Sequence, residues 1–140
     1  MFYKAIHFDI KELVDRDTYN RYGENAWMFL NPAALQMLDG LRDFFGCAVI
    51  VNNWHTGGPF QYRGFRSRFC NIGGDYSQHR FGNAFDCDIQ GWDAEAVRQK
   101  ILMNKDNPLL KNITRLESDV NWLHVDCANS PDRIRIVRPV

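Results

Sequence analysis

Long apolar segments, internal repeats and low-complexity linkers are all absent from this sequence of 140 residues. No run approaches the roughly 20 apolar residues that a transmembrane helix requires. Neither sign of charge dominates, because 17 basic residues balance 17 acidic ones. A balanced chain has no overall field that would attract nucleic acid or an anionic membrane. We therefore expect neither a membrane span nor a nucleic-acid partner.

We expect no secretory leader, and the sequence has no pair of closely spaced cysteines. Charges at Lys4, Asp9 and Lys11 come too early for the apolar core of a signal peptide. Synthesis in a cytoplasm is therefore expected. The four cysteines form no Cys-X-X-Cys pair, and thiols usually stay reduced in a cytoplasm. We predict free, buried thiols.

The residues that are present indicate a single domain spanning residues 1–140. Hydrophobic residues make up 45% of the chain and charged residues 24%, which is typical of a globular protein and argues against disorder. A chain of this length can bury a sizeable core.

Three segments are predicted to be helical. The clearest covers residues 31–46, where Asn31 can cap the first turn and Gly46 suits a left-handed exit. A shorter helix is predicted within residues 8–23, and a third within residues 93–104. Between the first strand and the next lies a long segment rich in Gly, Arg and aromatic residues, and long irregular loops in compact domains are usually functional or mobile.

Five segments are predicted to be strands, from their branched residues or their polar–apolar alternation: residues 47–54, 83–90, 112–118, 122–127 and 133–140. We expect the first strand to be buried on both faces and the last three to be antiparallel. Helices come early, and no helix connects the later strands. This order predicts an α+β domain with helices packed on one face of a mainly antiparallel sheet.

Two of the predicted strands carry polar residues of the metal-ligating type on one face. Strand alternation separates Asp86 and Asp88 from their apolar neighbours, and it places His124 and Asp126 together on one face. If these strands are neighbours, Asp86 and His124 converge, and His79 can join them from the preceding loop. Two imidazoles and a carboxylate are a ligand set of catalytic zinc. Zinc lowers the pKa of bound water to about 7.

The string SQHRFGNAFD fits the pattern Ser-X-His-X-X-Gly-X-Ala-X-Asp at every specified position, and WLHVD follows downstream. Together these motifs resemble the M15 family of zinc peptidases, which includes D-alanyl-D-alanine carboxypeptidases and phage endolysins. The resemblance covers roughly residues 30–130 and implies the hedgehog/DD-peptidase fold. It also implies that His79, Asp86 and His124 hold Zn²⁺, while a small residue at Gly82 lets the chain turn and pass close to the metal.

The same resemblance implies an arginine that binds the carboxylate or carbonyl of the substrate, a task suited to a planar guanidinium. Arg66 is the first candidate and Arg63 the second; the alternative is that these arginines only solvate a loop. Ser77 either forms a hydrogen bond near the metal or shapes the turn. Asp126 is expected to accept a hydrogen bond from a metal-bound histidine.

One position departs from the family pattern. Many members carry a catalytic acid three residues before the last histidine ligand, where this chain has Asn121. An amide cannot accept a proton at neutral pH. Glu117 is our candidate for the general base because a hairpin would bring it beside His124, and Asp119 is the second candidate. Alternatively, both are solvated turn residues and the protein is inactive.

Three functions are compatible with the sequence. The first is a zinc peptidase, phage endolysin-like, that cuts D-Ala-D-Ala or L-Ala-D-Glu bonds of bacterial peptidoglycan, acting as a monomer on the cell wall after release. The second is a wall-binding or virion structural module that keeps the metal site without catalysis, which Asn121 favours. The third, a nucleic-acid or regulatory protein that uses the arginine-rich loop, is disfavoured by the charge balance.

Overall fold

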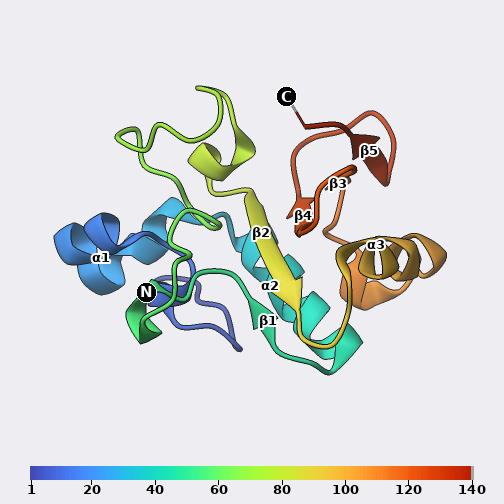
Figure 1. Ribbon diagram of the computed structural model, residues 1–140, viewed down its shortest axis with the longest axis horizontal. Coiled ribbons are helices and arrows are strands. Elements are labelled where there is room, and N and C mark those ends of the chain that lie inside the picture. Colours follow the sequence, from blue (N-terminus) through green and yellow to red (C-terminus); the bar gives the residue numbers. More distant parts are fainter. Residues whose placement is uncertain (140) are drawn as a thin grey trace.

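The computed structural model describes residues 1–139, which form three α-helices and a five-stranded sheet (Figure 1). The helices are α1 (Arg16–Tyr22), α2 (Pro32–Phe45) and α3 (Ala94–Met103). The strands are β1 (Val49–Ile50), β2 (Ala84–Ile89), β3 (Arg115–Glu117), β4 (Leu123–Asp126) and β5 (Arg135–Val137). Short 3₁₀ turns are η1 (Ile10–Glu12), η2 (Gly23–Phe29), η3 (Trp54–Thr56), η4 (Gln78–Phe81) and η5 (Pro108–Leu110).

The longest helix, α2, begins and ends where its sequence predicts. The Asn31 side chain accepts a hydrogen bond from the Ala33 amide at 3.0 Å, and Pro32 occupies the first turn. Gly46 closes the helix with a left-handed φ of 64°, a conformation that glycine adopts without steric cost. The buried side of α2 carries Leu35, Leu38 and Leu41 into the core.

The sheet has the strand order β1-β2-β4-β3-β5, and its pairs are antiparallel except for β3 and β5, which are parallel. The α+β class and the antiparallel pairing of β3 with β4 are therefore confirmed. The prediction that the last strand is antiparallel to its neighbour was wrong. β4 already pairs with one edge of β3. The chain reverses its direction after β4 and then pairs with the other edge of β3, so β5 runs parallel to β3.

One face of the central strands is apolar and packs against the helices. Phe85, Cys87 and Val125 on this face are all fully buried, and they belong to the same hydrophobic cluster as the leucines of α2 and the buried apolar residues of α3. In Figure 1, α2 lies behind β2, while α1 and α3 lie to either side of it. The opposite face of β2 and β4 carries the polar residues.

The first strand differs from its prediction. It is reduced to Val49–Ile50 and pairs on one side only, with β2, so that Ile50 is exposed while Val49 is buried. The chain leaves the sheet at Asn52, whose backbone N–H donates to the carbonyl of Glu12 at 2.9 Å. The prediction of burial on both faces was therefore wrong, because the face that carries Ile50 is open to solvent.

All four cysteines are free thiols, as predicted, and Cys70 and Cys87 are buried while the other two are partly so. No helix among residues 1–139 is long and apolar enough to cross a membrane.

Candidate metal centre

The pairing of β2 with β4 brings two of the predicted ligands together. In the antiparallel register Asp86 lies opposite His124, and directly opposed residues of an antiparallel pair share one face of the sheet. The neighbouring pairs, Phe85 with Val125 and Cys87 with Leu123, are buried on the other face. The apolar face thus fixes the register that sets Asp86 against His124.

The third predicted ligand, His79, lies in η4, directly before β2. Ser77 caps this turn, since its hydroxyl oxygen accepts a hydrogen bond from the His79 amide at 3.3 Å. Gly82 ends it with a φ of 72° and packs against the Phe29 backbone, where a side chain would collide. The glycine therefore allows the turn, as expected, but its close approach is to residue 29 and not to the metal ligands.

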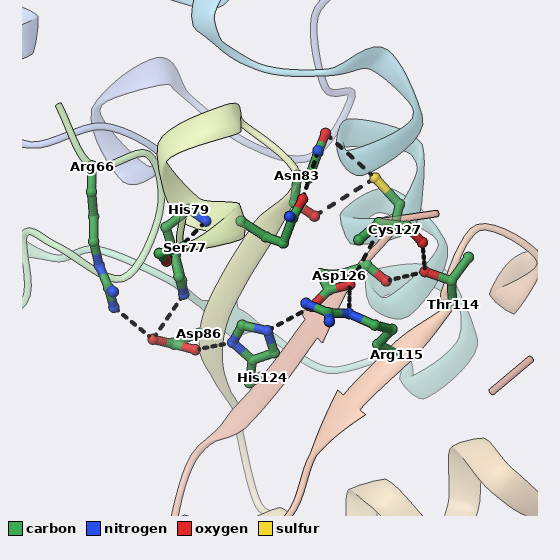
Figure 2. Close-up of polar contacts among 12 residues, drawn as sticks. Arg66, Ser77, His79, Asn83, Asp86, Thr114, Arg115, His124, Asp126 and Cys127 are labelled. Atoms are coloured by element: carbon green, nitrogen blue, oxygen red, sulfur yellow. Dashed lines mark hydrogen bonds and ion pairs between the residues drawn. The ribbon is translucent and has the colours of Figure 1, made fainter. Parts of the chain in front are cut away.

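The three side chains converge at one place in the interior (Figure 2). Asp86 Oδ1 lies 2.9 Å from His124 Nδ1, and Asp86 Oδ2 lies 3.3 Å from His79 Nε2. One ligand atom from each residue lies within 4.8 Å of the others. All three residues are buried, with at most 7% of their surface exposed. The predicted convergence of His79, Asp86 and His124 is confirmed.

The outer nitrogen of each histidine already has a hydrogen-bond partner. His79 Nδ1 lies 2.9 Å from the Gly64 carbonyl oxygen, and His124 Nε2 lies 2.9 Å from Asp126 Oδ2. Metal-bound histidines usually donate their outer N–H to such a carbonyl or carboxylate. The inner nitrogens, His79 Nε2 and His124 Nδ1, both face Asp86. This placement of Asp126 is the one predicted.

Arg115 completes this arrangement, and the sequence had not singled it out. Its guanidinium donates two hydrogen bonds to Asp126, from Nε to Oδ1 at 2.8 Å and from a terminal nitrogen to Oδ2 at 2.9 Å. Arg115 lies opposite Asp126 in the β3–β4 register. Aligning the predicted hairpin would have found the pair, since opposed residues share a face.

Burial and the close carboxylates shift the proton equilibria of the centre. Burial alone would lower the pKa of His124, but hydrogen bonds to Asp126 and Asp86 outweigh it and raise this pKa to about 9. Burial would raise the pKa of Asp86, but the two histidines hold it well below its usual range. Without metal, a protonated His124 therefore bridges two ionised carboxylates. A cation that binds here replaces that proton.

The two candidate arginines occupy different places. A terminal nitrogen of Arg66 lies 3.1 Å from Asp86 Oδ2, and its Nε donates to the Tyr62 carbonyl at 2.7 Å. Burial lowers the pKa of Arg66, while Asp86 acts against this shift. Arg63 instead pairs with Asp88 at 3.1 Å. The structure thus places Arg66 at the centre and Arg63 beside it.

The two candidates for the general base, Glu117 and Asp119, also lie in different places. Continuing the β3–β4 register by one residue sets the half-buried Glu117 opposite His124, on the same face. Asp119 is exposed in the turn, with a left-handed φ of 62°, and its carboxylate accepts a hydrogen bond from Ser118. Asn121 is exposed as well. Of the three, Glu117 is the residue that the sheet directs toward the centre.

The donor set fits a divalent metal ion. Zinc bonds to histidine nitrogen and carboxylate oxygen measure about 2.0–2.2 Å, so two ligands of one ion lie up to about 4.4 Å apart. The observed separations require only a small closure of the three side chains.

Comparison with protein-family models, with curated proteins and with solved structures gives no match for this chain. Support for a metal site therefore comes from the arrangement of the His79, Asp86 and His124 side chains.

Proposed function

We propose that the chain is a zinc-dependent peptidase of the M15 type, with the hedgehog/DD-peptidase fold, that hydrolyses peptide bonds of bacterial peptidoglycan in the manner of a phage endolysin. One observation carries the proposal. His79, Asp86 and His124 point their inner ligand atoms at one another in a buried site, while the outer histidine nitrogens are held by Gly64 and Asp126. The motif spacing supports the family, and the strand register supports the ligand set.

The proposed site has one ion held by the two imidazoles and by the Asp86 carboxylate. Two nitrogens and one oxygen suit zinc, and three protein ligands leave a fourth position for water or substrate. When bound, zinc supplies Lewis acidity that makes water nucleophilic near neutral pH and polarises a carbonyl.

The remaining groups of the chain would position the substrate and move the protons. Arg66 keeps one terminal nitrogen free of hydrogen bonds to residues 1–139, and this donor would orient the carbonyl of the scissile bond. Glu117, on the same face as His124, would accept the proton of the attacking water and pass it to the leaving amine. Ser77 would act indirectly, by holding the turn that presents His79.

A decisive experiment is hydrolysis of purified peptidoglycan with and without a chelator, followed by mass analysis of the released peptides. We expect hydrolysis to stop with the chelator, to return with added zinc, and to be lost in His124→Ala. Cleavage that is unaffected by thorough chelation would refute a metal-dependent mechanism. The masses of the products would identify the bond as D-Ala-D-Ala or L-Ala-D-Glu.

A second function is favoured by Asn121, which stands where the family pattern has an acid. In this alternative the chain is a wall-binding or virion structural module that retains the metal and lacks catalysis. Zinc-loaded protein that binds purified peptidoglycan and releases no peptide from it would support this function over the peptidase.

A further inference from the structure

A groove of about 440 Å³ runs between α1 and the irregular segment of residues 65–80. Arg66 lines this groove and also contacts Asp86 of the metal centre. Arg66 therefore connects the groove to the centre. The volume falls within the range of small-ligand sites, about 300–1,000 Å³.

Aromatic rings form the walls of the groove. Phe29 and Phe65 stack with their centroids 4.9 Å apart and their planes within 8° of each other. Tyr22 packs edge-on against Phe29, also at 4.9 Å. Phe69, by contrast, is 67% exposed at the margin of the groove. The apolar walls are thus built into the fold, and Phe69 is the most exposed of their rings.

The groove also carries more positive than negative charge. Four arginines line it against two aspartates, Asp17 and Asp75. Arg80 is structural, because its guanidinium donates to three backbone carbonyls. Arg21 is paired with Asp17 at 3.1 Å.

Arg68 differs from the other arginines of the groove. Its side chain has neither an ion pair nor a hydrogen bond to any part of residues 1–139, and it is exposed. The guanidinium carbon of Arg68 lies 4.9 Å from the centroid of the Phe69 ring, and that of Arg21 lies 5.5 Å from it. Two guanidinium groups are thus gathered against one exposed ring, and one of them lacks an anion.

We propose that this groove binds the carboxylate-bearing part of an acidic peptide, with Arg68 as the carboxylate receptor and the aromatic walls contacting the rest of the peptide. The inference rests on the proposed peptidase function, and it specifies the substrate as a peptide with a carboxylate close to the scissile bond. A planar guanidinium pairs with a carboxylate through two parallel hydrogen bonds.

Two observations favour a peptide over a nucleic acid. The chain as a whole is neutral, with 17 basic and 17 acidic residues, whereas affinity for a phosphate backbone depends on many basic residues. The groove also meets the metal centre at Arg66, so a short peptide would lie in the groove while its neighbouring bond reaches Asp86 and His124.

Binding to the metal-free protein tests the groove independently of hydrolysis. Two short peptides that contain L-Ala-D-Glu are titrated in the presence of chelator, one with the α-carboxylate of the glutamate free and one with it amidated. We expect the free carboxylate to bind about 10-fold more tightly, the factor that corresponds to 1.4 kcal/mol. In Arg68→Gln, which removes an exposed side chain, this preference should disappear.

Lys100→Gln is the matched control, because it removes one exposed positive charge from α3, on the other side of β2 (Figure 1). Equal binding of the two peptides to the native protein would overturn the proposal, and so would a preference that persists in Arg68→Gln or is lost equally in Lys100→Gln. Displacement of the peptide by inorganic phosphate at equal concentration would show a general anion site and also overturn it. If the preference holds but peptidoglycan is not cleaved, the peptidase proposal fails while the groove stands.

Discussion

The affinity of the centre for zinc should depend steeply on pH, because His124 must lose a proton before it can bind a metal. In the metal-free protein, its hydrogen bonds to Asp126 and Asp86 raise the pKa of His124 to about 9. At pH 7, about two units below that pKa, displacing the proton weakens metal binding about 100-fold, or by roughly 2.7 kcal/mol. The pKa of Asp86 is far too low for its carboxylate to contribute a second proton.

Apparent affinity should therefore rise about tenfold per pH unit from pH 7 and level off near pH 9, with close to one proton released per ion bound. Competition against a chelator of known affinity gives the slope. Calorimetry in two buffers of different ionisation enthalpy gives the proton count. Constant affinity from pH 7 to 9 without proton release would refute the protonated His124 bridge.

Asp126→Asn supplies the control for this prediction. It removes one of the two carboxylates that raise the pKa of His124, so the pH at which affinity levels off should fall. At pH 9, where the proton no longer competes, the variant should still bind zinc about 10–100-fold more weakly, the usual effect of losing a partner of a metal-bound histidine. An unchanged pH profile in Asp126→Asn would show that Asp126 does not control this proton.

Four further predictions concern other groups. Glu117→Gln should retain zinc and lose about 10²–10⁴-fold in peptide hydrolysis, while Asp119→Asn stays near normal; equal rates for both variants would argue against Glu117 as the base. Arg66→Ala should lower kcat/KM at unchanged metal content, because it contacts Asp86 without being a ligand; metal analysis beside the kinetics would expose a merely structural role. Gly82→Ala should lower the free energy of unfolding by more than the roughly 1–2 kcal/mol cost of a left-handed residue, because its methyl group would also collide with the Phe29 backbone. Urea denaturation measures this loss, and Gly74→Ala is the control because the space around Gly74 is open. Finally, protonated His124 stabilises the metal-free fold fully below its unfolded pKa of 6.5, so stability should decline as pH rises through about 9; denaturation midpoints that do not fall over this range would contradict it.

The convergence of His79, Asp86 and His124 could be predicted from the sequence because their positions depend on local periodicity. Alternation along two strands determined which face carries Asp86 and His124, and Gly82 marked the turn that presents His79. Each of these signals lies within about ten residues of chain. The α2 boundaries followed from Asn31 and Gly46 for the same reason.

The features that the sequence did not predict depend on contacts between distant segments. Arg66 was ranked before Arg63 by the family resemblance alone, because no periodic signal shows which arginine of an irregular loop contacts Asp86. The parallel direction of β5 follows from which edge of β3 was still free. Arg115 was overlooked because its partnership with Asp126 requires the exact hairpin alignment.

The register of the central strands gives the centre a further use, as a probe of folding accuracy. A slip of one residue between β2 and β4 would turn His124 to the apolar face and separate it from Asp86. Such a misfolded sheet would keep nearly the same strand content and escape detection by circular dichroism. If the centre binds zinc as proposed, metal uptake would instead count only the molecules whose two strands are correctly aligned, and zinc per chain would measure the homogeneity of a preparation.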